Sequence, residues 1–288
     1  MDVFPIPGFS EPISSLSHLI AAGVALYGGL FLFREGKGNK TRFFSLFIFT
    51  FALVFLFSMS GVYHLLEPGN VPREVFRRLD HAAIWVLIAG TFTPIHTLLF
   101  RGIWRTGFLF FIWAIAITGL VLEVVFFGSV PEWLSLTFYL SLGWMGVISG
   151  IKYAMDYGPG GAKLLVAGGL AYSIGAIFEF LRWPTLADGI FGPHELFHMF
   201  IILAAGFHWW FIHQRAGHPI INKLIVDVIE YPNSKFYAKT RGERIELTAD
   251  SLEELQLKIH AEVEKRFPKY VRPKNMVLKF SKEAIVPL

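Results

Sequence analysis

Two short motifs place histidines at a spacing that suits a metal site. His194 and His198 are separated by Glu-Leu-Phe, so on a helix both imidazoles lie on one face about one turn apart. In the motif Ser-Gly-Val-Tyr-His, Ser60 lies one turn before a third histidine, His64. Three neutral imidazoles with an open fourth position form a catalytic zinc site, whose bound water has a pKa of about 7. We therefore predict zinc as the cofactor and these three histidines as its ligands.

Asp80 is the candidate general base of this site. His64 ends the second long apolar segment of the chain, Asp80 begins the third and His194 begins the seventh. When neighbouring segments run antiparallel, these three ends lie on the same side. A carboxylate there would hydrogen-bond the zinc-bound water and accept its proton, while the Ser60 hydroxyl would orient the water or a substrate oxygen. Asp80 and Ser60 are therefore the predicted catalytic residues.

Two other interpretations of the histidines stay open. They could be interfacial residues at helix ends that contact lipid headgroups. His-Glu-x-x-His is also the zinc metalloprotease signature, in which the glutamate, here Glu195, is the general base. The protease interpretation leaves His64 and Asp80 without a role. Several polar groups at one membrane face are energetically unfavourable. Their presence together therefore favours a functional site over contacts with lipid headgroups.

The composition indicates a polytopic membrane protein. Of the 288 residues, 54% are hydrophobic and 16% are aromatic, and the mean hydropathy is +0.52. Seven apolar runs reach the ~20 residues that a helix needs to cross a ~30 Å hydrocarbon core. They lie at 12–33, 43–66, 79–100, 104–127, 132–154, 161–183 and 193–213. Because short links force neighbouring helices to run antiparallel, we predict an all-α, up-and-down bundle of seven helices.

Composition also excludes several classes of protein and site. The net charge of +4 is modest, and no RNA-recognition, zinc-finger or helix-turn-helix pattern accompanies it, so nucleic acid is not an expected partner. The absence of cysteine excludes disulfides and thiolate metal sites. The first eleven residues contain no Lys or Arg and a long span follows them, so no cleavable signal peptide is expected.

The composition changes after about residue 217. We therefore divide the chain into a membrane domain at 1–217 and a soluble domain of ββαβ type at 218–288. A strand is predicted at 224–229, a hairpin at 236–247 with its turn at 240–243, and a last strand at 276–280. Ser251 and Glu254 form a capping box ahead of a helix. No chemistry is evident in this domain, so we expect it to bind a cytosolic protein or a second copy of itself.

The distribution of basic residues predicts the orientation in the membrane. The side that carries the histidines holds four basic residues: Arg73, Arg77, Arg78 and Arg182. The opposite side holds nine: Arg34, Lys37, Lys40, Arg42, Arg101, Arg105, Lys152, Lys163 and Arg215. By the positive-inside rule the second side is cytoplasmic. The soluble domain is therefore expected in the cytoplasm and the zinc site toward the extracytoplasmic face.

Three sequence blocks resemble the signature blocks of the hemolysin III branch of the progestin and adipoQ receptor family. They are Ser-Gly-Val-Tyr-His at 60–64, Leu-Asp-His at 79–81 followed by Leu-Ile-Ala-Gly-Thr-Phe-Thr-Pro at 87–94, and His-Glu-Leu-Phe-His at 194–198. Their order, their spacing and their positions in the spans are similar to those of the family. The likeness covers roughly residues 10–215, and the three blocks together are far more specific than any one alone.

The resemblance implies a seven-helix fold with zinc bound by His64, His194 and His198. It also implies that Asp80 contacts the metal-bound water and that Ser60 lies beside it. Because the wider superfamily includes alkaline ceramidases, the implied chemistry is lipid amide hydrolysis. Two features depart from the pattern. The C-terminal domain is not part of the usual bacterial form, and the adiponectin-receptor branch places its N-terminus and zinc site toward the cytosol, opposite to the charge distribution found here.

These observations favour a zinc-dependent, membrane-embedded hydrolase of amide or ester bonds, with a membrane lipid as its substrate or ligand. One alternative is a seven-span receptor or sensor in which zinc is structural. Another is a channel of the hemolysin III type, although the sequence shows no ring of pore charges or filter motif. An intramembrane zinc protease is the remaining alternative. An open fourth coordination position would favour the hydrolase, and a closed one the receptor.

Overall fold

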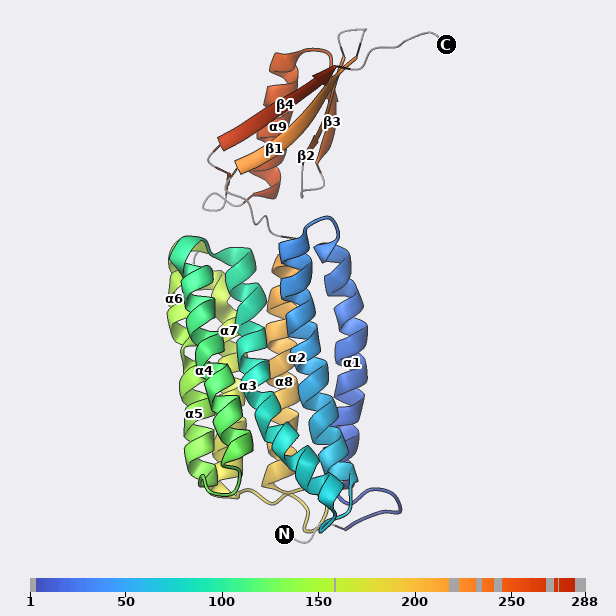
Figure 1. The fold of residues 1–288 in the computed structure, drawn as a ribbon, viewed down its shortest axis with the longest axis vertical. Coiled ribbons are helices and arrows are strands. Elements are labelled where there is room, and N and C mark those ends of the chain that lie inside the picture. Colours follow the sequence, from blue (N-terminus) through green and yellow to red (C-terminus); the bar gives the residue numbers. More distant parts are fainter. Residues whose placement is uncertain are drawn as a thin grey trace. The chain divides into compact units, whose positions relative to one another are not determined.

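The computed structural model describes residues 4–157, 159–217, 223–231, 235–240, 245–267, 272–273 and 275–282. The chain divides into two compact units. The first comprises Met1–Gly36 and Thr41–Gly217, and the second comprises Lys37–Lys40 and His218–Leu288. The first unit is a helical bundle and the second is a small α+β fold (Figure 1).

Within the described residues of the bundle, seven helical segments are long and apolar enough to cross a bilayer, which confirms the predicted seven-span fold. Three are single helices near the N-terminus: α1 (Pro12–Gly36), α2 (Lys40–Leu65) and α3 (Val71–Leu99). The fourth joins a short 3-10 turn, η1 (Gly102–Trp104), to α4 (Thr106–Val125). The others are α5 (Glu132–Trp144) with α6 (Gly146–Tyr157), η2 (Pro159–Ala162) with α7 (Lys163–Leu181), and α8 (Pro193–Arg215).

The outer surface of the bundle is apolar. Large side chains such as Phe51, Phe110 and Leu170 are at least half exposed. In water such a surface would favour aggregation, whereas in a bilayer it contacts lipid tails at no cost. The exposed aromatic and aliphatic residues therefore agree with the chain's being an integral, multi-pass membrane protein.

Two spans differ from the ranges expected from hydropathy. Helix α3 begins at Val71 and not near residue 79. Its first two turns carry Arg73, Arg77 and other polar side chains, which hide a helix from a hydropathy pattern, while a proline in the first turn favours a helix start. The fifth span is broken into α5 and α6 at Met145, whose N–H donates to the carbonyl oxygen of Leu142.

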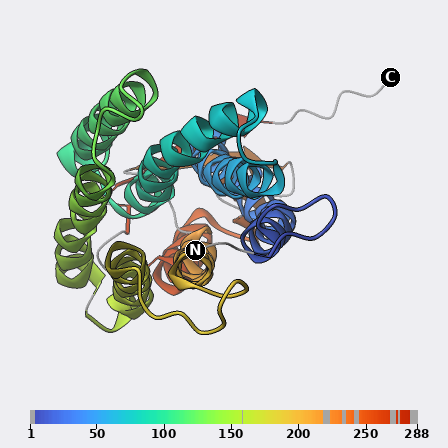
Figure 2. The ribbon, with the colours of Figure 1, turned by 90° about the horizontal axis from the view of Figure 1, so that it is seen from below.

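Helix α8 lies between α1 and α7 in the view along the bundle, and it also contacts α3 (Figure 2). Close helix approaches support this arrangement. A Cβ atom on Gly61 of α2 would lie 2.7 Å from Leu19 Cγ of α1, and a Cβ atom on Gly175 of α7 would lie 2.7 Å from Phe200 Cβ of α8. Only glycine permits these approaches, and they position the ends of α2 and α8.

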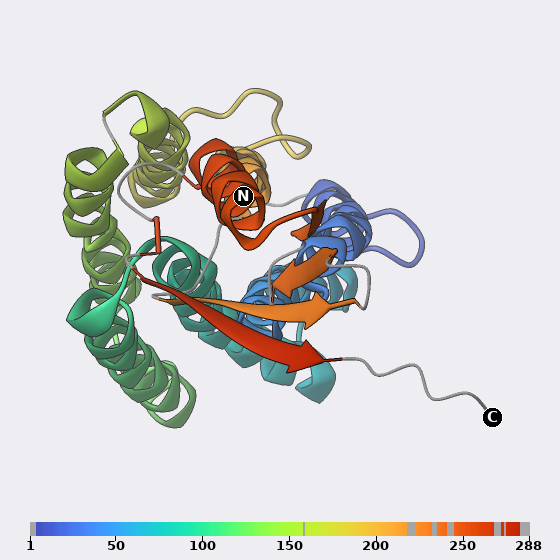
Figure 3. The ribbon, with the colours of Figure 1, turned by 90° about the horizontal axis from the view of Figure 1, so that it is seen from above.

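The second unit is a four-stranded sheet with one helix, within the residues that the structure describes. Its elements are β1 (Lys223–Glu230), β2 (Phe236–Thr240), β3 (Glu246–Ala249), α9 (Leu252–Arg266) and β4 (Asn275–Lys282). The strand order is β3-β2-β1-β4, with β1 antiparallel to β2 and parallel to β4. Helix α9 covers one face of the sheet (Figure 3). Three strands precede the helix, so the topology is βββαβ, with the elements in the order of the predicted strand, hairpin, helix and last strand.

Local sequence signals account for this small fold. Alternating residues of β1, among them Leu224, Val226 and Val228, are buried beneath the helix residues Leu255 and Ile259. The Ser251 hydroxyl caps α9 by accepting a hydrogen bond from Glu254 N at 3.1 Å. The predicted hairpin turn at 241–243 lies outside the described residues.

Candidate metal centre

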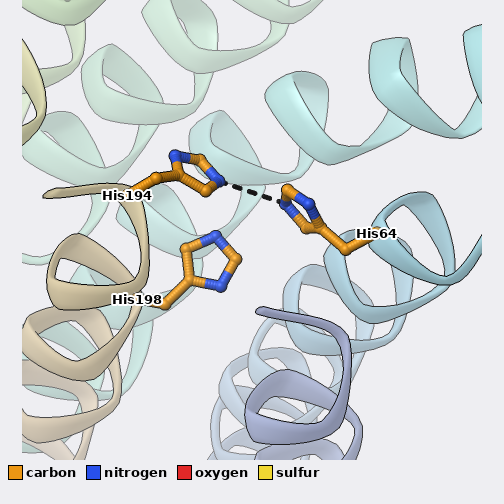
Figure 4. Close-up of side chains that lie close together, drawn as sticks. All are labelled: His64, His194 and His198. Carbon is orange, nitrogen blue, oxygen red and sulfur yellow. Dashed lines mark hydrogen bonds between the residues drawn. The ribbon is translucent and has the colours of Figure 1, made fainter. Parts of the chain in front are cut away.

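Three histidines from two helices meet at one end of the bundle. His64 comes from the last turn of α2, and His194 and His198 come from the first turns of α8 (Figure 4). One ligand atom from each residue lies within 4.8 Å of those of the other two. His64 and His198 are buried, while the His194 side chain remains 34% exposed. The group could therefore hold a metal ion that is reached from one side.

The Nε2 atoms of His64 and His194 face each other at 3.2 Å (Figure 4). Two nitrogens bound to one tetrahedral zinc ion, each at ~2.05 Å, would lie about 3.3 Å apart. The ring centroids of His198 lie 4.9 Å from His64 and 4.5 Å from His194. The spacing of His64 and His194 therefore matches two nitrogen ligands of one ion, and His198 lies close enough to be a third ligand.

The opposite ring nitrogens of the same pair contact carboxylates. The Nδ1–H of His64 donates to Glu11, and the Nδ1–H of His194 donates to Glu179 Oε2 at 3.2 Å. An ionised carboxylate can only accept, so each Nδ1 carries a hydrogen, and each ring in its neutral form presents the lone pair of Nε2. Two lone pairs facing each other at 3.2 Å repel unless a positive charge lies between them. This donor set therefore fits a metal ion.

The two carboxylates are held in turn by arginines. Glu11 precedes α1, and its other oxygen accepts a hydrogen bond from Arg73 of α3. Burial by itself would raise the pKa of the Glu11 carboxyl, but the hydrogen bonds from His64 and Arg73 and the charge of the guanidinium outweigh burial and lower the pKa from 4.5 to about 2. Glu179, at the end of α7, accepts a hydrogen bond from Arg182. The arginines thus hold both carboxylates in place, where they accept hydrogen bonds from the histidine N–H groups.

The third histidine is held differently. The Nδ1 atom of His198 is buried and has no hydrogen-bond partner among the described residues. Its ring stacks on that of His18 from α1, with centroids 3.8 Å apart and planes at 8°. His18 is 1% exposed, and its two ring nitrogens likewise lack partners within the described part of the chain. Packing against His18 therefore helps to orient the His198 ring.

The structure places both predicted catalytic residues in the wall of the cavity that contains the histidines. This cavity of about 1140 Å³ is lined by Asp80 in the third turn of α3, by Ser60 on α2, and by all three histidines. It continues along the bundle past apolar side chains such as Ile88 and Leu170. The site is therefore continuous with a long, largely apolar chamber.

Glu195 has a local structural role. Its Oε1 accepts a hydrogen bond from the Ser14 hydroxyl at 2.9 Å, and its Oε2 accepts one from Gly192 N, also at 2.9 Å. The carboxylate thus caps the N-terminus of α8 and joins it to α1. With both oxygens engaged in this way, Glu195 is poorly placed to be the general base that the protease interpretation requires.

The roles of Glu11 and Glu179 were not found by sequence reasoning. Glu179 lies within the sixth apolar run, and Glu11 lies in the segment before the first span. A usable signal was present: Glu11, Ser14 and His18 follow each other at helical spacing ahead of and inside α1. Nothing in that local pattern names His64 as the partner, because the contact joins segments that lie far apart in the chain.

Comparison with known proteins gives a consistent picture. The family model described as "Haemolysin-III related" matches residues 9–209. The chain is 32% identical over 197 residues to "Hemolysin-3" of Bacillus cereus, which covers 67% of this chain and 85% of that protein. It is 29% identical over 194 residues to "Hemolysin-3 homolog" of Bacillus subtilis (strain 168), covering 67% of this chain and 87% of that protein. It is 27% identical over 252 residues to "Adiponectin receptor protein" of Drosophila melanogaster, covering 75% of this chain and 55% of that protein.

Proposed function

Because the chain belongs to the haemolysin-III-related family of membrane proteins, and three histidines converge in its bundle, we propose that it is a zinc-dependent hydrolase of lipid amide or ester bonds. The observation that carries the proposal is the pair of facing Nε2 atoms of His64 and His194 at the end of an apolar chamber. A metal site that opens into such a chamber suits a substrate with a polar reacting group and a long apolar tail.

The proposed zinc ligands are His64, His194 and His198. A bound zinc ion supplies Lewis acidity, which acidifies water and stabilises negative charge on a carbonyl oxygen. The carboxylate of Asp80 accepts a proton during attack and returns it to the leaving group. The Ser60 hydroxyl, buried beside His64, orients the reacting oxygen by hydrogen bonding.

The apolar walls of the chamber exclude water and align the tail of the substrate. Side chains from α3, α5 and α7, such as Ile88, Leu140 and Leu170, line it. Burial of a long acyl chain against them contributes ~0.8 kcal/mol per methylene group. Binding energy far from the reacting carbonyl thus holds the scissile bond at the histidine end of the bundle.

The charge distribution supports an orientation with the histidines toward the extracytoplasmic face. Two of the basic residues on that side, Arg73 and Arg182, form ion pairs with Glu11 and Glu179. Helix α8 begins at the histidines and leads to the C-terminal domain from its other end. In this orientation the domain at 218–288 lies in the cytoplasm, where it binds a cytosolic protein or a second copy of the chain.

A panel of lipids tests the proposal directly. The purified protein in detergent is given ceramides, N-acyl amines and phospholipids, and release of fatty acid is measured with and without a zinc chelator. Hydrolysis that chelation abolishes and zinc restores supports the proposal. A protein that binds zinc and hydrolyses none of these lipids would overturn it. That outcome favours the receptor with structural zinc. The similarity to the adiponectin receptor protein also supports that alternative.

A further inference from the structure

The geometry points to two arginine–glutamate–histidine chains that position the metal ligands, and we propose that Glu11 and Glu179 set the affinity of the site for its ion. The first chain runs from Arg73 through Glu11 to His64. The second runs from Arg182 through Glu179 to His194. The inference rests on the proposed zinc site, and it assigns positioning roles to residues that do not themselves touch the metal.

The first chain ties the segment before α1 to the end of α2. Glu11 N donates to the carbonyl oxygen of His64 at 3.0 Å, and Ser10 N donates to that of Leu65 at 3.3 Å. These backbone bonds hold the Glu11 carboxylate beside the His64 ring. Arg73, which is 7% exposed, completes the chain, since its guanidinium also donates to the carbonyl oxygen of Leu66. The position of this carboxylate is therefore fixed from both sides.

The second chain is built on the end of α7. Glu179 is 7% exposed, and Arg182 follows it by three residues in a left-handed conformation with φ 52°. This turn brings the guanidinium back to the Glu179 carboxylate, while its other nitrogen donates to Glu132 at 2.7 Å. The carboxylate that faces His194 is thereby anchored, although the arginine itself is 57% exposed.

A carboxylate on Nδ1 has two consequences for a metal ligand. It keeps the hydrogen on Nδ1, so Nε2 offers its lone pair, and it raises the basicity of the ring. Outer partners of this kind typically contribute 10–100-fold to metal affinity. Each arginine limits the motion of its carboxylate by a charge-assisted hydrogen bond. Both effects act on the two Nε2 atoms that face each other at 3.2 Å.

The experiment measures zinc affinity of the full-length protein in detergent by competition with a chromogenic chelator. The variants are Glu11→Gln and Glu179→Gln, with His64→Ala as the reference for a lost ligand. Glutamine keeps the size of the side chain, removes its charge and leaves one acceptor oxygen in place of two. Glu195→Gln is the matched control, since it removes a buried carboxylate next to His194 that bonds Ser14 and Gly192 instead of a histidine.

We expect Glu11→Gln and Glu179→Gln each to weaken zinc binding by about 10–100-fold. The absorption spectrum of the Co²⁺-loaded protein shifts in both variants, because the basicity of a ligand ring changes. Thermal unfolding of the metal-free protein changes little, which separates positioning from a merely structural role. Arg182→Gln gives a smaller loss of affinity, and Glu195→Gln stays within about twofold of the unchanged protein.

The failure of the inference and that of the metal site give different results. Loss of zinc in His64→Ala, with both glutamine variants within about twofold of the unchanged protein, overturns the two chains but leaves the site. If the protein without any substitution binds no zinc, the proposed zinc site is wrong, and the proposed role of the two chains is wrong with it. If Glu11→Gln does not fold, Glu179→Gln decides the question alone, because its carboxylate and its arginine lie in one short segment.

Discussion

The Nε2 atoms of His64 and His194 lie 3.2 Å apart, although 130 positions separate the two residues in the chain. They meet because α2 ends and α8 begins at the same end of an up-and-down bundle. Because each Nδ1 donates to a glutamate, the lone pairs of the two Nε2 atoms face each other whenever both rings are neutral. Together with His198, this pair forms a group that could hold a metal ion, and it leads to measurable expectations.

The first prediction concerns metal content. The purified protein holds about one zinc ion per chain, and His64→Ala, His194→Ala and His198→Ala each remove most of it. Three ligands leave none to spare, so each loss exceeds the roughly 10–100-fold that an outer residue contributes. Elemental analysis of the folded variants measures this. His208→Ala is the control, since that partly buried ring lies farther along α8 and hydrogen-bonds the carbonyl oxygen of Leu165 on α7. Two ligand variants that keep full zinc would contradict the site.

The second prediction separates turnover from metal binding. Asp80→Asn keeps most of the zinc and loses hydrolysis by about 10²–10⁴-fold, the usual contribution of a general base. Glu195→Gln has a milder effect, because the amide oxygen can still accept from Gly192 N while its NH2 group donates to the Ser14 hydroxyl oxygen. Initial rates on the best lipid substrate, together with zinc content, measure both variants. The reversed pattern, with Glu195 essential and Asp80 dispensable, supports the protease interpretation instead.

The third prediction concerns orientation. A fluorescent or enzymatic reporter fused after Leu288 behaves as a cytoplasmic protein, since most of the basic residues lie on that side of the bundle. A reporter inserted after Gly69, between α2 and α3, behaves as an extracytoplasmic one. Paired reporters that are active only inside or only outside the cell provide the measurement. The opposite pair of results places the histidines on the cytosolic side, as in the adiponectin-receptor branch.

The fourth prediction concerns the C-terminal unit. Leu255→Ala removes a fully buried side chain from the face of α9 that packs on the sheet, which destabilises this unit by about 2–5 kcal/mol. Leu257→Ala, two residues away and 70% exposed, changes its stability little. Pulse proteolysis of the full-length protein in increasing urea measures both. Zinc content stays unchanged in each variant, because the two units have separate cores. Lost zinc in Leu255→Ala would contradict that independence.

Much of the bundle is readable from the sequence. Hydropathy locates the seven spans because the bilayer demands long apolar runs whatever their neighbours are. It places the start of α3 eight residues too late, since the polar first turns around Arg73 and Arg77 belong to a helix that hydropathy cannot detect. It also misses the break at Met145, which depends on local backbone geometry in an otherwise apolar segment.

The sequence by itself also determines that His194 and His198 share one helix face, because helical spacing is a local property of the chain. Only the tertiary structure decides that His64 joins them and that Glu11 and Glu179 take the Nδ1 hydrogens. Which ring nitrogen points into the site depends on rotamers and hydrogen bonds set by α3, α7 and the segment before α1. No local pattern encodes these contacts, because each joins residues brought together only when the helices pack.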